Sequence, residues 1–267
     1  MVNDYRGKAV LITGGTKGIG LATGLAFGRQ GAECTLTSKW GSADEAEIRA
    51  AFAAAGAPEP HIVEADVADN EDTQRLLADM KARWGHVEAF ISNVGFGHVV
   101  KDLDDYALRS LFKSIEYSAW PMIEYTRRIK DVFGKYPRYV IGLSSGGPDH
   151  FHTNYDFIAA SKAVLETFCK YLNHRLFEED IRINVLRPRF VKTDSLRATM
   201  GDEFEGFVDR FDKTHPWVSP DETANAILGL CSGLMDGVSG QVVTLDHGAS
   251  FSDNLMRMFA ERSTLFA

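Results

Sequence analysis

The 267-residue chain has few cysteines, no long apolar run and no excess of positive charge. Its three cysteines, Cys34, Cys169 and Cys231, are an odd number without metal-ligand spacing, so we expect buried, reduced thiols in a cytoplasmic protein and no metal site. No apolar stretch approaches the ~18 residues of a membrane-spanning helix, and no signal-peptide pattern precedes the first apolar run. The formal net charge of −8 argues against nucleic acid or an anionic membrane as a partner.

The remaining composition is that of an ordinary globular protein, 45% hydrophobic and 25% charged, without repeats or a linker-like change along the chain. Short apolar runs alternate with helix-compatible patterns, which predicts one α/β domain over 1–267 with a parallel sheet covered on both faces. The seven predicted strands lie at 9–13, 34–37, 61–65, 87–92, 139–143, 182–186 and 242–245. The predicted helices are one after the first strand, 43–55, 69–84, a long helix within 105–133, 157–178 and 220–234.

A glycine-rich turn follows the first predicted strand and opens the first helix. Gly14 allows the sharp turn out of the strand, Gly18 lets the backbone approach an anionic ligand, and Gly20 lets the helix pack against the strand. The helix N-terminus then directs unpaired N–H groups at the ligand. This context predicts a dinucleotide site, with a purely structural turn as the alternative. The other loop residues assigned to the site are Thr16, Lys17 and Ile19.

The spacing T-G-x-x-x-G-x-G resembles the short-chain dehydrogenase/reductase family, in which this loop opens a single-domain Rossmann fold. The resemblance implies further cofactor contacts after the later strands, although Asp66 has a turn or helix-cap role as its alternative. Two positions depart from the family pattern, because Ser92 replaces the first Asn of an N-N-A-G turn and Arg189 replaces the Gly of P-G-x-V-x-T. The matching positions are Asp66 and Val67 for adenine, Asn93 and Gly95 after the fourth strand, and Val191 and Thr193 for the nicotinamide carboxamide.

The end of the second predicted strand indicates which nicotinamide cofactor is bound. An acidic residue there would accept hydrogen bonds from a free ribose 2′-hydroxyl and repel a 2′-phosphate. Ser38 occupies that position, Lys39 follows it, and Lys17 in the glycine loop adds a second cation. Two cations without an acid favour a phosphate, so we predict NADPH, with two solvated surface lysines as the alternative.

The catalytic pattern departs from the one that most family members share, because Ile158 stands where the Tyr of Y-x-x-x-K is expected. Tyr155 lies seven residues before Lys162, about two helical turns, so both side chains can share one face. This Y-x6-K spacing resembles the divergent enoyl-acyl-carrier-protein reductases. In that branch the Lys binds the nicotinamide ribose and the Tyr donates to the thioester carbonyl oxygen. A phenol aimed there would stabilise the enolate, and a nearby ammonium would lower the phenol's pKa.

Ser145 completes the predicted catalytic set of Tyr155, Lys162 and Ser145. It lies thirteen residues before Ile158, the spacing of ketoreductases in this family, and either binds the substrate oxygen or orients its loop. His152, in the same loop, is a second candidate proton donor, with a solvated histidine as the alternative. Residues 101–133 hold no Asn for the family's usual water relay, which leaves Ser114 and Glu116 as nearby polar candidates.

Apolar residues spaced three or four apart within 194–217 predict an amphipathic helix. The resemblance makes this segment a lid over an apolar substrate, and the alternative is a helix that faces the core. The apolar tail, 251–267, predicts packing against the lid or a neighbouring subunit, and thus a homotetramer or homodimer. The predicted substrate contacts are Phe96, His152, Leu196, Met200 and Phe204.

These expectations favour an NADPH-dependent oxidoreductase that reduces the conjugated C=C of an enoyl thioester. The substrate would be an apolar small molecule or a carrier-bound acyl group. Two alternatives stay open at this point. One is an NADPH-dependent ketoreductase of a polyketide or other apolar ketone with an atypical active site, and the other is a non-catalytic NADPH-binding sensor.

Overall fold

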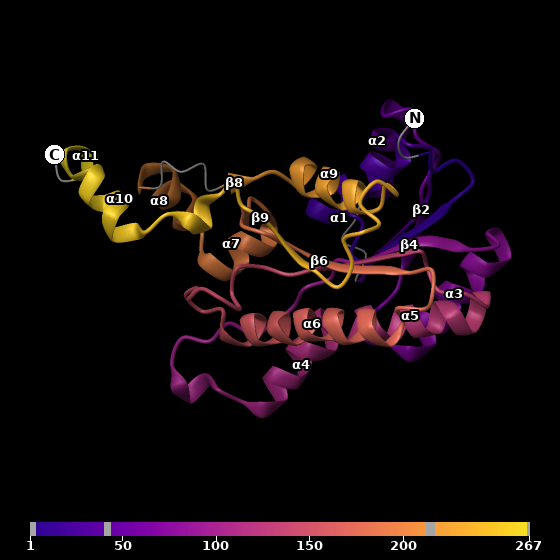
Figure 1. Cartoon of the computed structure of the whole chain (residues 1–267), viewed down its shortest axis with the longest axis horizontal. Helices are drawn as coiled ribbons and strands as arrows, with labels where there is room; N and C mark the ends of the chain where they lie inside the picture. The colour runs from indigo at the N-terminus through magenta and orange to yellow at the C-terminus, as the bar shows by residue number, and fades with distance from the viewer. Residues whose placement is uncertain (1–3, 40–43, 212–216, 266–267) are drawn as a thin grey trace.

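A seven-stranded parallel sheet in the order β3-β2-β1-β4-β5-β6-β9 forms the centre of the protein, as the computed structural model in Figure 1 shows. The structure describes residues 4–39, 44–211 and 217–265. The strands are β1 (Ala9–Ile12), β2 (Glu33–Ser38), β3 (His61–Glu64), β4 (Val87–Ser92), β5 (Tyr139–Leu143), β6 (Arg182–Pro188) and β9 (Val242–Leu245). Every neighbouring pair is parallel, which confirms the predicted doubly covered Rossmann sheet.

The chain order reverses between β1 and β4. From β1 the chain builds outward through β2 and β3, and then returns to add β4 on the other side of β1. A ligand crevice in such a sheet lies at this switch point, outside the carboxyl ends of the strands. The glycine loop after β1 and the turn after β4 therefore meet at the predicted cofactor site.

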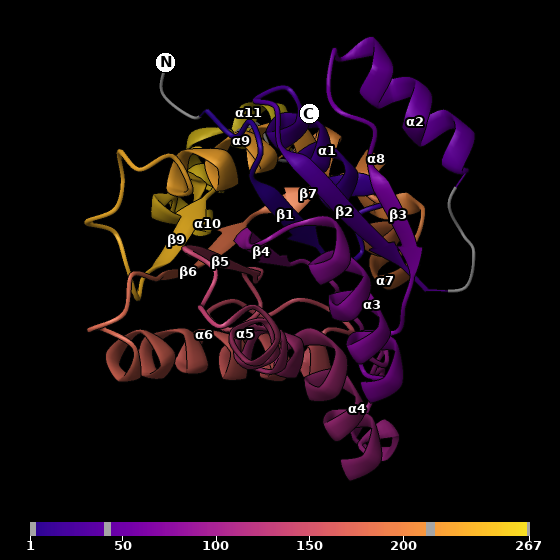
Figure 2. The same ribbon diagram turned by 90° about the vertical axis from the view of Figure 1, so that its right-hand side faces the viewer.

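Helices cover both faces of the sheet, as Figure 2 shows. Because β1 is buried on both sides, Val10 and Ile12 belong to one core and Leu11 belongs to the other. One face carries α1 (Gly18–Gly28), α2 (Glu45–Ala54) and α9 (Pro220–Leu230). The opposite face carries α3 (Asn70–Arg83), α4 (Leu108–Ser118), α5 (Trp120–Phe133) and α6 (Asp156–Arg175).

The prediction of one long helix within 105–133 is wrong. A short 3₁₀ turn, η1 (Leu103–Asp105), precedes two separate helices, α4 and α5. They meet at Ala119, whose φ of −124° and ψ of −48° are not helical. Pro121 lies in the first turn of α5, where its missing N–H is tolerated, but it cannot continue a helix that comes from α4. The break places the end of α4 near the cofactor site.

Other helix ends differ from the prediction by a few residues. Asp69 caps α3 as predicted, and its side chain accepts hydrogen bonds from the backbone N–H groups of Glu71 and Asp72. The prediction that the last long helix runs to Leu234 is wrong, because α9 ends at Leu230 and Gly233 then adopts a left-handed φ of +82°.

A separate group of short elements lies beyond the carboxyl ends of the strands, at the left of Figure 1. The apolar stripe predicted within 194–217 is divided between two helices, because Gly201, with φ of +87°, separates them. Residues 212–216 of this segment lie outside the described residues. The group comprises β7 (Phe190–Val191), β8 (Trp217–Val218), α7 (Asp194–Met200), α8 (Glu203–Phe211), η2 (Ala249–Phe251), α10 (Asn254–Ala260) and α11 (Arg262–Leu265).

The three cysteines are buried and free, as the sequence predicts. Burial raises the pKa of the Cys169 thiol to about 12, so it stays protonated at neutral pH. Within the described ranges, no helix is both long and apolar enough to cross a membrane.

Candidate active site

The glycine loop has the close backbone packing that the sequence predicts. Gly14 and Gly18 adopt left-handed φ values of +63° and +53°. A Cβ atom at Gly20 would lie 2.1 Å from the carbonyl oxygen of Gly14, so a side chain there would collide with the loop backbone. The Asn93 amide donates to the carbonyl oxygens of Thr13 and Gly14, each at 3.0 Å. Asn93 therefore holds the loop in place from the end of β4.

The N-terminus of α1 offers backbone donors to an anion. Lys17 is the residue before the helix, and its side chain does not cap the first backbone N–H groups of α1. These N–H groups can therefore donate to a bound anion. The methyl group of Thr193 lies 3.5 Å from the position of a Cβ at Gly18, so the segment after β7 approaches the loop. A Cβ at Gly95 would lie 3.5 Å from Lys162 Nζ. These surfaces fit a dinucleotide that runs from the helix N-terminus toward Lys162.

Three side chains interact at the adenosine end of the predicted site. Lys39 Nζ forms an ion pair with Asp66 and donates to the Tyr117 hydroxyl at 2.6 Å. The same hydroxyl donates to Asp66 Oδ2 at 2.9 Å. Burial alone would raise the pKa of Asp66, but these bonds and the N–H of Ala68 hold it below its ordinary value. Ser38 is buried beside them at the end of β2.

Tyr117 at this end of the site was not predicted. Its position in α4 carries no motif, and only the sheet order brings that helix to Asp66.

Tyr155 lies immediately before α6, not inside the helix as its predicted spacing assumes. Its ring is half-buried and packs so closely on Gly147 that a Cβ there would lie 2.8 Å from ring carbons. Burial raises the pKa of the phenol, and the neighbouring Ser145 hydroxyl offsets part of that rise. Ser145 Oγ is buried and has no hydrogen bond of regular geometry among the described residues. A phenol and a hydroxyl therefore face the same space.

Lys162 lies on α6 and is only 5% exposed. Lysine side chains in proteins are rarely buried to this extent. Its Nζ donates to the carbonyl oxygen of Leu143 at 2.6 Å. Burial lowers the pKa of the ammonium to about 8, although the charge of Glu166 acts in the opposite direction. The group is therefore mostly protonated at neutral pH and loses its proton slightly above it.

Ile158, at the family's usual tyrosine position, packs in the core. It is 9% exposed, and a Cβ at Gly97 would lie 2.3 Å from its Cγ1. The two relay candidates each have a partner within α4. Ser114 Oγ donates within its own helix to the carbonyl oxygen of Ser110, and Glu116 pairs with Lys113.

An aromatic cluster extends from Tyr155 toward the elements after β6. The His152 ring centroid lies 5.4 Å from those of Tyr155 and Phe190, and Phe190 lies 5.1 Å from Phe204. Trp217 joins the cluster at 6.1 Å from Phe190. Burial lowers the pKa of His152, and the nearby charges of His150 and Arg189 lower it further. His152 is therefore mainly a neutral side chain at pH 7, with its ring tilted against those of Tyr155 and Phe190.

The other predicted substrate residues are less closely connected to this cluster. Leu196 and Met200 are half-buried on α7. Phe96 lies in a different group, 5.5 Å from the ring of Tyr117 and 5.5 Å from that of His98. Of the predicted carboxamide contacts, Val191 is buried in β7, and Thr193 caps α7 by accepting from the N–H of Leu196 at 3.2 Å. Of the adenine and loop residues, Val67 and Thr16 are buried and Ile19 packs against the core.

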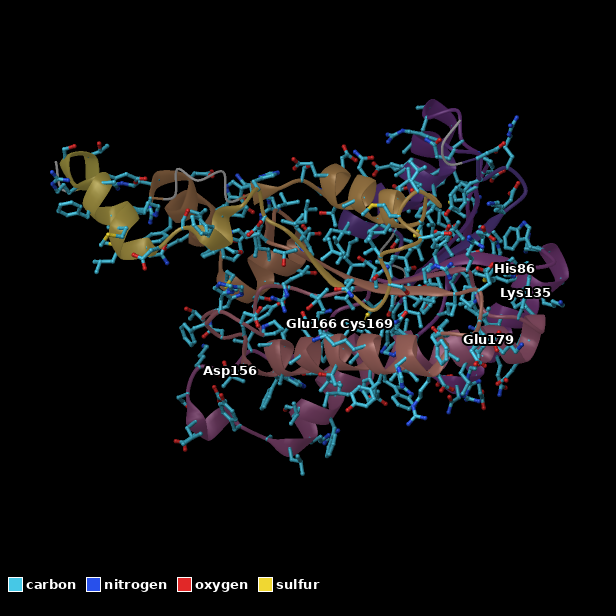
Figure 3. The ribbon with its side chains drawn as sticks, in the orientation of Figure 1. His86, Lys135, Asp156, Glu166, Cys169 and Glu179 are labelled. Atoms are coloured by element: carbon cyan, nitrogen blue, oxygen red, sulfur yellow. The ribbon has the colours of Figure 1, made fainter. Side chains whose placement is uncertain are left out.

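A buried ion-pair network beside Lys162 was missed by the sequence analysis. Glu166 Oε1 accepts from Ser144 Oγ at 2.5 Å and from Arg187 Nε at 3.0 Å, and its Oε2 accepts from Arg187 Nη2 at 2.6 Å. Arg187 also forms an ion pair with Asp149. Figure 3 shows Glu166 between α6 and the sheet. The one available signal was a glutamate four residues after Lys162, on the same helix face.

A cavity of about 630 Å³ lies at the opposite end of the sheet, near His86, Lys135 and Glu179 in Figure 3. Its walls include the ion pairs Lys8–Glu88 and Arg138–Asp180. It is remote from the glycine loop and is not part of the candidate active site.

Comparison with known proteins agrees with this geometry. Residues 14–250 match the family model described as enoyl-(acyl carrier protein) reductase. The chain belongs to the short-chain dehydrogenase/reductase family. Within this oxidoreductase family it resembles the enoyl-acyl-carrier-protein reductases, as its Y-x6-K spacing indicates.

Curated relatives in this family include both enoyl reductases and other reductases. The enoyl-(acyl-carrier-protein) reductase (NADH) of Escherichia coli strain K12 is 25% identical over 255 residues, which cover 92% of this chain and 95% of the relative. Versicolorin reductase 1 of Aspergillus parasiticus is 26% identical over 270 residues, covering 93% and 99%.

Solved structures of the family share the fold. A short-chain type dehydrogenase/reductase from Mycobacterium marinum superposes with a TM-score of 0.81 at 19% identity, covering 94% of this chain and 98% of that one. A short-chain dehydrogenase from Burkholderia cenocepacia in complex with NADP has a TM-score of 0.79 at 20% identity, covering 93% and 100%.

Proposed function

We propose that this protein reduces the conjugated C=C of an enoyl thioester with NADPH. The observation that carries the proposal is where Ile158 and Tyr155 lie at the start of α6. Ile158 fills the usual tyrosine position and is packed against Gly97, whereas the phenol of Tyr155 faces Ser145 and the aromatic cluster. A phenol displaced in this way suits the carbonyl oxygen of a thioester, which lies away from the carbon that receives hydride.

The residues of the site divide the chemistry between them. The bound nicotinamide would supply the hydride. Lys162 Nζ, below Gly95, would hold the ribose hydroxyls in place of its present bond to the Leu143 carbonyl. The Tyr155 phenol would donate to the oxygen on which negative charge develops, and its protonated form is favoured by burial. The apolar walls of Phe190 and Phe204 would exclude water and contact the acyl chain.

We infer NADPH from the cations at the adenosine end. Lys17 is largely exposed and lies 4.0 Å from Asp194. Lys39 directly follows the buried Ser38 and forms an ion pair with Asp66 at the same end of the site. A 2′-phosphate could draw on both ammonium groups. The relatives include an enzyme named for NADH and a structure in complex with NADP, so both cofactors occur among similar proteins.

A parallel assay tests the reaction and the cofactor together. Oxidation of NADPH is measured with crotonyl and acetoacetyl thioesters, and NADH serves as the cofactor control. We expect turnover of the crotonyl thioester with NADPH. Turnover of the acetoacetyl thioester alone would instead establish a ketoreductase and remove Tyr155 from its proposed role. Tight NADPH binding without turnover of either would support the non-catalytic sensor.

Replacing Lys39 with Met is expected to raise the KM for NADPH by about 10- to 100-fold, because a charged hydrogen bond contributes roughly 1.5–3 kcal/mol. The KM for NADH should change much less, since NADH has no phosphate for Lys39 to bind. Steady-state kinetics with both cofactors measure the difference. Lys135→Met, at the opposite end of the protein, is the control (Figure 3). Equal changes for the two cofactors would contradict the assignment of Lys39 to the phosphate.

One observation favours ketone reduction as the second candidate. Ser145 Oγ is buried without a regular hydrogen bond in the described part of the chain, so it is available to a substrate carbonyl. In that reaction Ser145 would bind the ketone oxygen and Tyr155 or the substrate's own hydroxyl would supply the proton. The similarity to versicolorin reductase 1 agrees with this alternative.

The partner proposals follow from apolar surface. We propose an apolar or carrier-bound acyl substrate, with 194–217 as its lid, and a homodimer or homotetramer that covers the C-terminal elements. Phe251 is 97% exposed and Leu255 is 68% exposed, which is unfavourable for a monomer in water. A cytoplasmic location remains a prediction from the sequence.

A further inference from the structure

A charged network connects the helix that carries Lys162 with the loop that carries the other catalytic candidates. Glu166 is four residues after Lys162 on α6, so both side chains lie on one face of that helix. Glu166 is 8% exposed, and Arg187 from the end of β6 binds it through two nitrogens. The third guanidinium nitrogen of Arg187 pairs with Asp149. One arginine thus links α6, β6 and the loop.

We propose that Glu166, Arg187 and Asp149 are positioning residues: Glu166 keeps Lys162 in its ammonium form, and Arg187 together with Asp149 fixes the 145–155 loop to β6. The proposal rests on the placement of Lys162 and Tyr155 in the active site. It adds to that function a group of residues that would touch neither substrate nor cofactor.

The charge half of the proposal follows from the surroundings of Lys162. The groups facing its ammonium from β5 and from the turn after β4 are neutral, namely the Leu143 carbonyl and Gly95. Burial in such surroundings favours the uncharged amine. Glu166 is the group that opposes this effect electrostatically. In this buried position Glu166 accepts hydrogen bonds from Ser144 and from two nitrogens of Arg187.

The loop half of the proposal follows from the attachment of Asp149. Within the loop, the N–H groups of Asp149 and His150 donate to the Gly146 carbonyl at 3.1 and 3.0 Å, which forms a compact turn after Ser145. The bond from Arg187 to Asp149 ties this turn to the end of β6. The same loop continues to His152 and Tyr155, whose rings are in contact. Loss of the tie would let the phenol and the serine hydroxyl move apart.

Two measurements that need no substrate test the effect of Glu166 on Lys162 and the attachment of the 145–155 loop. For the charge, lysine labelled with ¹³C at Cε is titrated by NMR, and Lys162→Met assigns the resonance. We expect Glu166→Gln to lower the midpoint of Lys162 by roughly one pH unit, because it removes a nearby negative charge. Glu166→Asp keeps the charge and should leave the midpoint close to that of the wild type. An unchanged midpoint in E166Q would overturn the charge half.

For the loop, amide hydrogen exchange of residues 145–155 is measured in Asp149→Asn. Faster exchange there is expected, with a fall in kcat/KM of about tenfold from misplacement of the phenol and no change in the Lys162 midpoint. Asp180→Asn is the matched control, because Asp180 is a similarly exposed partner of Arg138 at the opposite end of the sheet. Exchange equal to that of D180N would overturn the loop half.

These outcomes are separable from the proposed reaction. If the protein reduces neither thioester, the NMR titration and the exchange rates still decide the proposal. Asp149 is 59% exposed, so D149N tests the loop even if E166Q fails to fold. If the thioester is reduced but both readouts match the wild type, the reaction stands and the positioning role is refuted.

Discussion

Tyr155→Phe is expected to lower kcat for the reduction by about 10²- to 10⁴-fold, the usual contribution of a positioned proton donor. The affinity for NADPH should change little, since the Tyr155 ring contacts Gly147 and His152 rather than the glycine loop. The phenylalanine ring keeps the packing on Gly147, so the melting temperature should also be close to that of the wild type. Single-turnover kinetics and cofactor fluorescence measure the two effects.

The control for this variant is Tyr171→Phe, which removes a phenol from the exposed surface of the same helix. It should have the activity of the wild type. A Tyr155→Phe protein with kcat close to that of the wild type would show that another group donates the proton. Ser145 and His152 would then be the residues to test, because both lie beside the phenol.

Gly20→Ala is expected to weaken cofactor binding and to lower kcat/KM by roughly 10²-fold, the loss of rate that a misplacement of about 1 Å can cause. The added Cβ would lie 2.1 Å from the Gly14 carbonyl oxygen and 2.8 Å from Asn93 Nδ2, so the loop or the helix must move. Overpacking of this kind also lowers the free energy of unfolding by ~1–3 kcal/mol. Isothermal titration with NADPH and thermal unfolding measure the two losses.

Gly229→Ala provides a matched substitution in another helix. Gly229 lies in α9, and a Cβ there would meet nothing within 4 Å. We expect unchanged cofactor affinity and a small gain in stability, about 0.5–1 kcal/mol, because alanine is the better helix former. If G20A and G229A bound NADPH equally well, the close approach of the loop to α1 would not matter for binding.

The sequence by itself determined the order of the strands and helices and the main cofactor loop. Strands such as Val87–Ser92 are short apolar runs because they are buried on both faces, and such runs can be predicted from the sequence. The glycine loop can also be predicted from the sequence, because the positive φ values at Gly14 and Gly18 favour glycine at both positions. The seven-residue spacing from Tyr155 to Lys162 is also visible in one segment, although Tyr155 lies just before α6 and not within it.

Patterns along the chain were less informative where two structures share one periodicity. The apolar repeat of 105–133 fits one helix or two, and Pro121 is compatible with both an interior kink and the first turn of a new helix. In the same way, the stripe within 194–217 does not show that Gly201 turns the chain between α7 and α8. Local backbone geometry decided both cases.

Only the tertiary structure decided which side chains pair around the site. Tyr117 meets Asp66 across 51 positions of the chain, and Arg187 meets Asp149 across 38. These pairs depend on the order of strands in the sheet and on the helix that covers each face, neither of which is encoded in a local pattern. Burial then decides the chemistry, because it lowers the pKa of the Lys162 ammonium to about 8, although the charge of Glu166 acts in the opposite direction.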